Sequence, residues 1–319
     1  MEAFLKQKHI DYVKLQEEHR LYEYWLSEHL RMNGIYWGIM ALATMDELSA
    51  LPRAEVEKFV LSCWDDKYKA FGAFPGHDAH ILSTLSGLQI LKIYDSELKQ
   101  LTNEQKQGVV KFIEGLQLSD GSFQGDRFGE VDTRFVYTAL QALLLLGALT
   151  KSVVDPSVEF IMRCQNFDGG FGMAPGSESH AAQVFVCVAA LAVVDRLDLV
   201  VDDAKLAAWL SERQLHLGGF NGRPEKLEDV CYLWWVLLLL AIIDKKHWVD
   251  LKKLQSFILS CQNPEKGGFS DRPDNQTDIY HTCFSITGLA LTDAPGFIKI
   301  DPIFCLPCEV TMGMIKWKE

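Results

Sequence analysis

Apolar residues along this chain gather into long runs that alternate with shorter amphipathic segments. The runs 135–149, 181–194 and 232–243 are apolar almost all round, which is the pattern of a helix buried on every side. Each run follows a segment such as 160–164 or 209–213 that keeps polar residues on one face, as a helix of an outer layer does. The pattern therefore predicts inner and outer helices in alternation.

A glycine turn that ends in phenylalanine recurs between the two kinds of segment. Its copies are Gly121-Ser-Phe123, Gly169-Gly-Phe171, Gly218-Gly-Phe220 and Gly267-Gly-Phe269, at steps of 48, 49 and 49 residues, with a degenerate copy at Phe71-Gly-Ala-Phe74. A period near 50 indicates a repeat architecture. Propellers share this period, but apolar runs of 13–15 residues are longer than strands. With a further inner helix at 31–42, we expect an all-α fold, an α/α barrel (toroid) of six inner and about six outer helices, forming one domain over residues 1–319.

Composition and charge limit the partners. The chain is 48% hydrophobic, with 31 basic and 43 acidic residues and a net charge of −12. This composition supports a large core and disfavours nucleic acid or an anionic membrane as the main partner. The N-terminal residues lack an apolar signal core, and the longest apolar run, 231–243, is too short to cross a bilayer. We expect a soluble cytoplasmic protein without an integral membrane segment.

The eight cysteines lie mostly in apolar helical contexts, which indicates reduced core residues. Cys305-Leu-Pro-Cys308 is a single CxxC with no second pair to complete a metal site. We expect it to be an incidental pair in the C-terminal tail.

Residues 217–235 hold the most distinctive chemistry. A carboxylate at Asp229 and a thiol at Cys231 suit zinc, which accepts oxygen, nitrogen and sulfur ligands. Residues two apart point to different sides of a regular helix, so this pair must lie at a helix start. His281, one repeat later, is the best third ligand, and three protein ligands leave the open position of a catalytic zinc site.

Each inner helix after the first is preceded by an acidic residue with a distinctive residue shortly after it. The set is Asp78/His80, Asp132/Arg134, Glu178/His180, Asp229/Cys231 and Asp278/Tyr280-His281. In a closed barrel these positions converge on one mouth. Asp78 and Asp132 are expected to serve mainly as helix N-caps, whereas capping does not explain the cysteine and histidine of the last two pairs.

Two cations, Arg223 and Lys226, precede the proposed zinc pair, with His180 and Tyr232 expected nearby. Beside a helix N-terminus they form an anion site suited to diphosphate. Aromatic residues fall on the predicted inner helices at Tyr36, Trp37, Phe135, Tyr137, Phe185, Trp234, Trp235 and Phe284. An aromatic cavity beside a diphosphate site suits a long apolar chain. The combination predicts alkylation of a thiol by an allylic diphosphate.

Three stretches resemble the β subunits of protein prenyltransferases. They are Gly218-Gly-Phe-Asn-Gly-Arg-Pro-Glu-Lys-Leu-Glu-Asp-Val-Cys-Tyr-Leu-Trp-Trp235, Pro175-Gly-Ser-Glu-Ser-His180 and Asp278-Ile-Tyr-His281. Among these enzymes, the short length, Arg31-Met-Asn-Gly-Ile-Tyr-Trp-Gly38 and Asp132-Thr-Arg-Phe135 are most similar to the type II, or Rab, geranylgeranyltransferase β subunit.

The resemblance implies a function, partners and residue roles. It implies transfer of geranylgeranyl from its diphosphate to C-terminal cysteine thiols of Rab GTPases that a Rab escort protein presents. An α subunit would complete a heterodimer and add a lysine to the diphosphate site. The implied roles are one zinc (Zn2+) per β subunit on Asp229, Cys231 and His281, diphosphate on His180, Arg223, Lys226 and Tyr232, and isoprenoid on Asn33, Trp37, Leu85 and Trp235.

Some alternatives stay open. Asn33 stands where the Rab enzyme has a small serine, so a farnesyl or type I geranylgeranyl enzyme remains an alternative. Asp271 stands where farnesyltransferases keep a carboxylate linked to magnesium, and use of Mg2+ here is open. A terpene cyclase would need a DDxxD motif, whereas residues 65–69 end in lysine. A zinc-stabilised scaffold without catalysis is distinguished by metal analysis combined with an activity assay.

Overall fold

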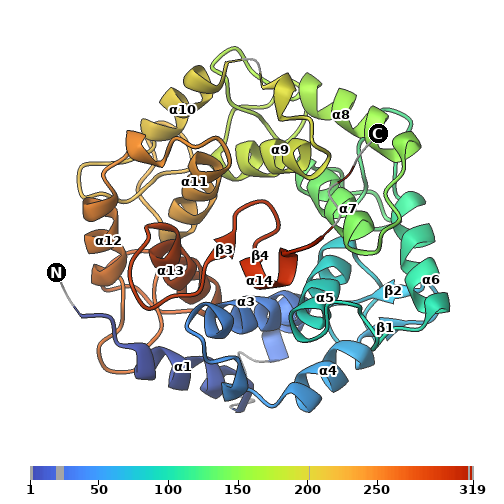
Figure 1. The fold of residues 1–319 in the computed structure, drawn as a ribbon, viewed down its shortest axis with the longest axis horizontal. Coiled ribbons are helices and arrows are strands. Elements are labelled where there is room, and N and C mark those ends of the chain that lie inside the picture. The colour runs from blue at the N-terminus through green and yellow to red at the C-terminus, as the bar shows by residue number, and fades with distance from the viewer. Residues whose placement is uncertain (1–2, 19–24, 201, 315–316, 318–319) are drawn as a thin grey trace.

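The computed structural model describes residues 3–18, 25–200, 202–314 and 317. Its helices form two concentric rings, seen end-on in Figure 1. In this described part, six helices make the inner ring: α3 (Arg31–Thr44), α5 (Ile81–Tyr94), α7 (Thr133–Leu145), α9 (Ala181–Val193), α11 (Val230–Ile242) and α13 (Ile279–Leu291). Each packs against the next, and α13 packs against α3, so the inner ring closes.

Six further helices of the described residues lie outside this ring. They are α1 (Lys6–Glu18), α4 (Arg53–Ser62), α6 (Asn103–Glu114), α8 (Lys151–Arg163), α10 (Asp203–Ser211) and α12 (Leu251–Ser260). The remaining elements are short: η1 (Glu28–Leu30), η2 (Leu48–Ala50), η3 (Leu197–Leu199), η4 (Lys246–Trp248), α14 (Cys308–Thr311) and two antiparallel strand pairs, β1 (Trp64–Asp65) with β2 (Ala70–Phe71) and β3 (Ile300–Asp301) with β4 (Leu306–Pro307). The prediction of an α/α toroid is confirmed.

Local sequence sets the ends of the inner helices. Four of them end two residues before an aspartate in the left-handed region, at Asp46, Asp195, Asp244 and Asp293, each with φ between 56° and 60°. A left-handed residue after a helix stops it and satisfies its last carbonyls. The aspartates therefore end these four inner helices at similar lengths.

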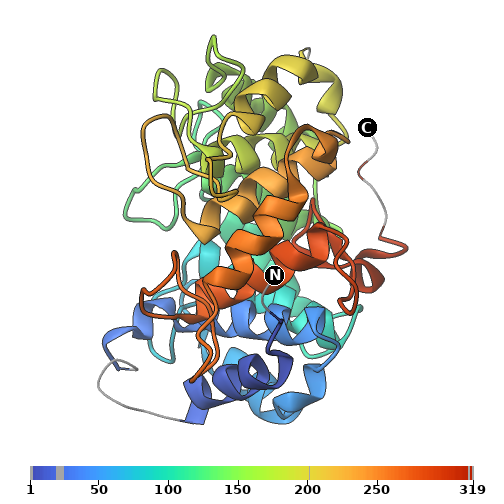
Figure 2. The same ribbon diagram turned by 90° about the vertical axis from the view of Figure 1, so that its left-hand side faces the viewer.

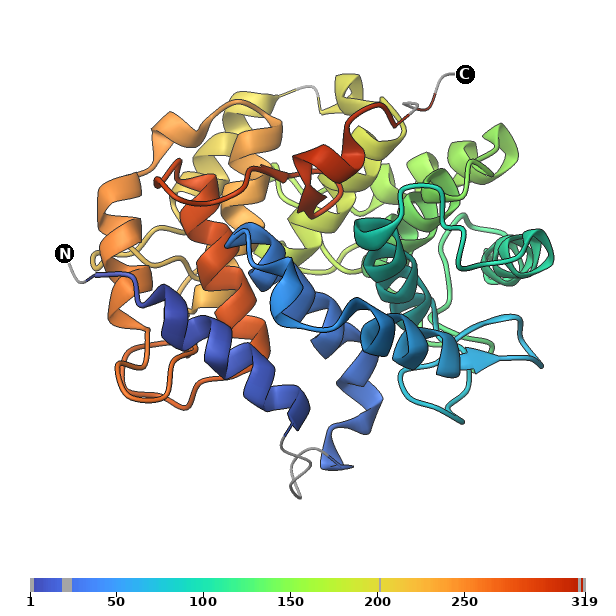
Figure 3. The same ribbon diagram turned by 60° about the horizontal axis from the view of Figure 1, so that its bottom comes forward.

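The glycine turns attach each repeat to the next outer helix. A Cβ on Gly121 (φ +88°) would lie 1.9 Å from the carbonyl oxygen of Pro156 in α8. A Cβ on Gly267 (φ +77°) would lie 2.2 Å from the carbonyl oxygen of Lys8 in α1. Only glycine permits both the conformation and the close approach. Helix α1 thus follows the fifth repeat in space, and Figure 3 shows it beside α13.

The two ends of the ring differ. Figure 2 shows long loops at one end, which we call the mouth, and the C-terminal segment with β3, β4 and α14 at the other. Tyr36 and Tyr137 donate hydrogen bonds to the carbonyl oxygens of Cys305 (2.6 Å) and Ile303 (2.7 Å). Residues 300–307 therefore pack into the end of the ring opposite the mouth and do not form a free tail. That the Cys305/Cys308 pair is incidental as a CxxC motif stays a prediction.

Among the described residues, no helix is both long enough and apolar enough to cross a bilayer.

Candidate active site

The mouth is held together by a backbone hydrogen bond at the start of each of five inner helices. In each case a backbone N–H in the first turn of the helix donates to a carbonyl oxygen in the loop of the following repeat. The pairs are Met32 N to Ala73 O, Ile81 N to Gly125 O, Thr133 N to Met173 O, Ala181 N to Gly222 O and Val230 N to Asp271 O. These bonds satisfy helix N–H groups that have no partner within the helix. Side chains at the first turn of one helix are consequently brought next to the loop of the next repeat.

The five N-cap residues stand at one repeat position, nine residues after the fully buried phenylalanine of each repeat. They are His80, Asp132, His180, Asp229 and Asp278, and each accepts a hydrogen bond from the backbone N–H two residues on. Asp132 is a cap as predicted. The same prediction for Asp78 is wrong, because His80 occupies the cap position through its Nδ1 atom. A capping role does not exclude a role in chemistry, because Asp229 caps α11 and also belongs to the cluster described next.

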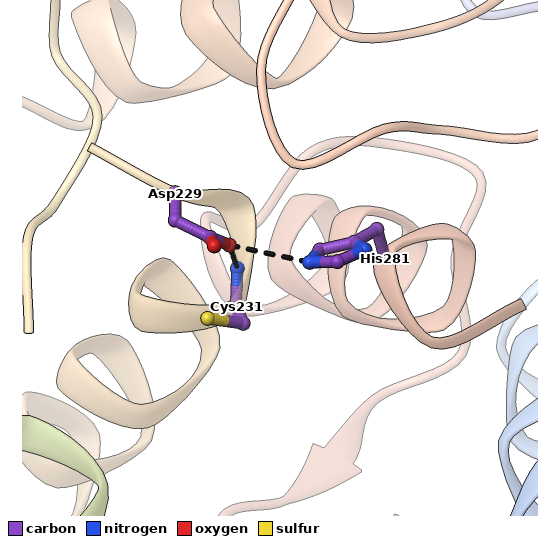
Figure 4. A group of neighbouring side chains, drawn as sticks. All are labelled: Asp229, Cys231 and His281. Atoms are coloured by element: carbon purple, nitrogen blue, oxygen red, sulfur yellow. Dashed lines mark hydrogen bonds and ion pairs between the residues drawn. The ribbon is translucent and has the colours of Figure 1, made fainter. Parts of the chain in front are cut away.

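Asp229, Cys231 and His281 form the one group of three or more potential ligands that the described residues offer to a metal ion. One ligand atom from each residue lies within 4.8 Å of the others. Asp229 and Cys231 come from the start of α11, as their spacing predicts, and His281 comes from the first turn of α13 (Figure 4). Nε2 of His281 lies 3.3 Å from Oδ1 of Asp229.

Asp278 orients the histidine of this cluster. Its Oδ2 atom accepts a hydrogen bond from Nδ1 of His281, while its Oδ1 atom caps α13 through Tyr280 N and His281 N. This arrangement leaves Nε2 of His281 facing Asp229 and Cys231, as the carboxylate–histidine–metal arrangement requires. Sequence reasoning noted Asp278 as an acidic residue before α13 but assigned it no role.

Burial and the neighbouring charges shift the pKa values of all three residues of this cluster. Burial lowers the pKa of His281, but hydrogen bonds with Asp229 and Asp278 outweigh this and raise it to about 10. Burial and the charge of Asp229 raise the pKa of the Cys231 thiol well above its ordinary value. Burial also raises the pKa of Asp229, but hydrogen bonds with His281 and Cys231 outweigh this and lower it. Both His281 and Cys231 hold protons that a metal ion has to displace.

The donor set fits zinc. Carboxylate, thiolate and imidazole ligands of zinc lie about 2.0–2.3 Å from the ion, which places them roughly 3–4 Å from one another. The 4.8 Å limit of the cluster requires only small side-chain movements to reach that spacing. Three protein ligands at the mouth leave a fourth position for an incoming thiol.

A cavity of about 530 Å³ adjoins this cluster and contains all four residues expected to bind diphosphate. His180, Arg223, Lys226 and Tyr232 line it together with Asp229, so the anion site and the metal cluster share a wall. The Tyr232 hydroxyl lies 3.4 Å from Nε2 of His180. Burial, followed by the charge of Arg223, holds the pKa of His180 below its ordinary value. A neutral His180 can donate a hydrogen bond without adding charge.

Arg272 is a cation of this cavity that sequence reasoning missed. It lines the same wall, and its Nε atom is buried without a hydrogen-bond partner. Its guanidinium pairs with Asp271 (3.3 Å), and Asp271 also accepts a hydrogen bond from Asn275 (2.8 Å). The signal was present in the repeat, because an Arg-Pro pair begins three residues after the buried phenylalanine both at Arg223 and at Arg272.

The four residues expected to line the isoprenoid pocket also come together. Asn33, Trp37, Leu85 and Trp235 line one cavity inside the inner ring. Its aromatic lining includes Trp37, Trp235, Phe185 and Tyr137. Ring centroids are 5.1 Å apart for Trp235 and Phe185 and 5.5 Å apart for Phe185 and Tyr137. Phe284 is not among the lining residues, but its ring centroid is 4.9 Å from that of Trp37 and 5.5 Å from that of Trp235. Cys305 of the C-terminal segment lines this cavity too, which nothing in its CxxC motif indicated.

A helical toroid with a metal-ligand cluster and a cationic cavity at its mouth defines a class of transferase, and comparison with known proteins shows the family. The prenyltransferase α-α toroid domain matches residues 4–306, and the chain belongs to this family, in its branch of type-2 geranylgeranyl transferase β subunits. The chain is 62% identical to geranylgeranyl transferase type-2 subunit beta of Candida albicans, over 98% of this chain and 96% of that one. It is 56% identical to the protein of the same name in Saccharomyces cerevisiae, over 99% and 98% of the two chains.

A solved structure shares the fold at lower identity. Candida albicans protein geranylgeranyltransferase-I, complexed with GGPP, superposes with a TM-score of 0.84 over the whole of both chains at 22% identity. The resemblance noted in the sequence to prenyltransferase β subunits of type II is therefore confirmed at the level of the family, and the toroid at the level of the fold.

Proposed function

We propose that this chain is the catalytic β subunit of a zinc-dependent protein geranylgeranyltransferase. It transfers geranylgeranyl from its diphosphate to C-terminal cysteine thiols of Rab GTPases. The observation that supports this most directly is the shared wall at Asp229, where a cluster able to hold a thiolate meets a cavity lined by three cationic side chains. The type-2 β-subunit relatives support the geranylgeranyl group as the one transferred.

The reaction breaks the bond between C1 of the prenyl chain and the diphosphate oxygen and forms a bond between C1 and sulfur. Asp229, Cys231 and His281 would hold the zinc, and a zinc bound there would lower the pKa of the substrate thiol toward the thiolate. Arg223, Lys226 and Arg272 stabilise the negative charge that grows on the departing diphosphate. His180 and Tyr232 add hydrogen bonds to the same oxygens, and the aromatic wall around Trp235 shields the prenyl chain from water.

Arg223 has to exchange partners during binding. In the structure it forms an ion pair with Glu178 across the cavity. A diphosphate carries more charge than one carboxylate and presents several acceptor oxygens to a guanidinium. Diphosphate binding therefore moves Arg223 from Glu178 toward the substrate.

The chain acts with partners. We propose a heterodimer with a prenyltransferase α subunit that contributes a lysine to the diphosphate site, and a Rab substrate presented by a Rab escort protein in the cytoplasm. Met173 and Leu227 line the cationic cavity yet are 46% and 67% exposed, which supports a protein partner beside it. We further propose that residues 1–319 act as a single domain.

Isotope-labelled transfer tests the function. The chain with its α subunit, a Rab protein and escort protein should transfer label from geranylgeranyl diphosphate and much less from farnesyl diphosphate. The chain alone should show little turnover. Preferential use of farnesyl diphosphate would favour the farnesyl alternative, and a chain with stoichiometric zinc but no transfer under any of these conditions would favour a structural role for the metal.

A further inference from the structure

The isoprenoid cavity is closed at its deep end by the C-terminal segment, and not by the ring itself. The inner helices begin at the mouth, so depth increases along each of them. Leu85 is the fifth residue of α5 and Gln89 the ninth, which places them about 6 Å and about 12 Å below the helix start at 1.5 Å per residue. Gln89 donates a hydrogen bond to the carbonyl oxygen of Phe304 (3.2 Å). The segment therefore crosses the cavity below Leu85.

Four polar side chains hold this segment at its depth. Tyr36 on α3, Gln89 on α5, and Tyr137 and Gln141 on α7 all donate to carbonyl oxygens of residues 303–305. Without these acceptors Tyr36, Tyr137 and Gln141 would lose the carbonyl oxygens to which they donate, at a cost of about 1–3 kcal/mol for each buried donor left unpaired. Gln89 would keep its hydrogen bond to the Tyr36 hydroxyl (3.3 Å). The floor is consequently a rigid surface and not a mobile tail.

Cys305 is the residue that this floor presents to the cavity. It lies among the cavity-lining residues, is 4% exposed, and has its thiol 3.9 Å from the Tyr137 hydroxyl. Its backbone is in the left-handed region at φ +53°, and its N–H donates to Asp301 O (3.0 Å) in the turn between β3 and β4. A non-glycine residue in this conformation persists where surrounding contacts fix it.

Because the floor is rigid and Cys305 is small, we propose that the side-chain volume of Cys305 sets the longest prenyl chain that the cavity accepts. This inference rests on the proposed function and adds a specificity-determining residue to it. The end of a 20-carbon chain contacts Cys305, whereas a 15-carbon chain ends above it.

The test uses the complex with the α subunit, escort protein and Rab substrate. Cys305→Met adds volume without the Cβ branch that the left-handed backbone disfavours. It should lower kcat/KM for geranylgeranyl diphosphate relative to farnesyl diphosphate by at least about tenfold, the scale of discrimination for one misplaced methylene. Cys305→Ser should keep the wild-type ratio. Cys308→Met is the matched control, because Cys308 begins α14 and does not line the cavity.

A second variant avoids a folding defect, because Cys305→Gly suits the left-handed backbone at this position. It removes side-chain volume from the floor, so it should raise kcat/KM for a 25-carbon prenyl diphosphate relative to geranylgeranyl diphosphate. An unchanged ratio in the folded Cys305→Gly complex, or an unchanged donor ratio in a folded Cys305→Met complex, overturns the inference. If the wild-type complex transfers neither group, the proposed function fails instead.

Discussion

Nε2 of His281 lies 3.3 Å from Oδ1 of Asp229, although the two side chains begin different helices of the inner ring. The contact exists because α11 and α13 are neighbours and both start at the mouth. It brings a nitrogen, an oxygen and the sulfur of Cys231 to one point, and the first prediction tests this point.

Replacing Cys231 or His281 by alanine should abolish both zinc binding and prenyl transfer, because two protein ligands do not complete the site. Zinc content by elemental mass spectrometry and transfer of labelled prenyl group are the measurements. Cys308→Ser, at a partly exposed cysteine outside the cluster, is the control and should retain both. Stoichiometric zinc with full transfer in either alanine variant would refute the metal assignment.

Asp278→Asn should weaken zinc binding by about 10–100-fold, the usual cost of losing a carboxylate behind a ligating histidine. The amide oxygen of asparagine can still cap α13, so the thermal unfolding temperature should change little. Competition with a chelator of known affinity measures the zinc constant. An unchanged constant would show that Asp278 serves α13 alone.

Arg272→Gln should raise the Kd of geranylgeranyl diphosphate by about tenfold, at the lower end expected for a charge-assisted hydrogen bond because Arg272 is partly exposed. Binding of geranylgeraniol, which lacks the diphosphate, should not change. Arg127→Gln is the control, because Arg127 lies over the ring of Tyr68, outside the cationic cavity. The same loss for the alcohol and the diphosphate would mean that Arg272 acts through the fold.

Bulky substitutions higher in the isoprenoid cavity should also shorten the accepted chain. Asn33 donates to the Ser86 hydroxyl (3.0 Å) and Leu85 is 6% exposed, and both line the cavity. Asn33→Trp with Leu85→Tyr should shift the donor preference from 20 to 15 carbons by more than about tenfold. Kinetics with the two donors decide this, provided that zinc content is unchanged. An unaltered preference would leave the floor at Cys305 as the controlling position.

Acid should weaken the packing of α1, which carries His9, against the fifth repeat. This side chain is fully buried, accepts the N–H of Gly268 at Nδ1 (3.0 Å) and lies with Nε2 3.3 Å from Oε1 of Gln262. Burial lowers its pKa to about 4, against an ordinary value of 6.5. As pH falls, the unfolded chain binds a proton at His9 before the folded chain does. The stabilisation that neutral His9 gives to the fold is therefore complete above pH 6.5 and is lost as pH falls toward 4. The whole of this effect on the free energy of unfolding is about 3 kcal/mol.

The pH dependence of the unfolding temperature, measured between pH 7.5 and 4.5, should be flatter in His9→Gln than in the wild type. His80 and His180 also have lowered pKa values and remain in both proteins, so only the difference between the two curves reports on His9. Parallel curves would show that the packing of α1 does not depend on the protonation of His9.

The sequence by itself determined the features that repeat. Apolar runs, acidic residues before helix starts and glycine turns are local signals, and each acts within one repeat of about 50 residues, so they predict the ring, its inner and outer helices and the mouth. The sequence also identified four site residues for the same reason, because they lie close together within 217–235: Asp229, Cys231, Arg223 and Lys226.

Only the tertiary structure decided which side chains meet across repeats. The approach of His281 to Asp229, the approach of Tyr232 to His180 and the position of Arg272 in the wall of the diphosphate cavity depend on how one helix start meets the next loop. The place of Cys305 depends on contacts more than 160 residues distant along the chain, from Tyr36 and Tyr137. No local pattern encodes such contacts, because they form only when the ring has closed and presents its unpaired donors to the C-terminal segment.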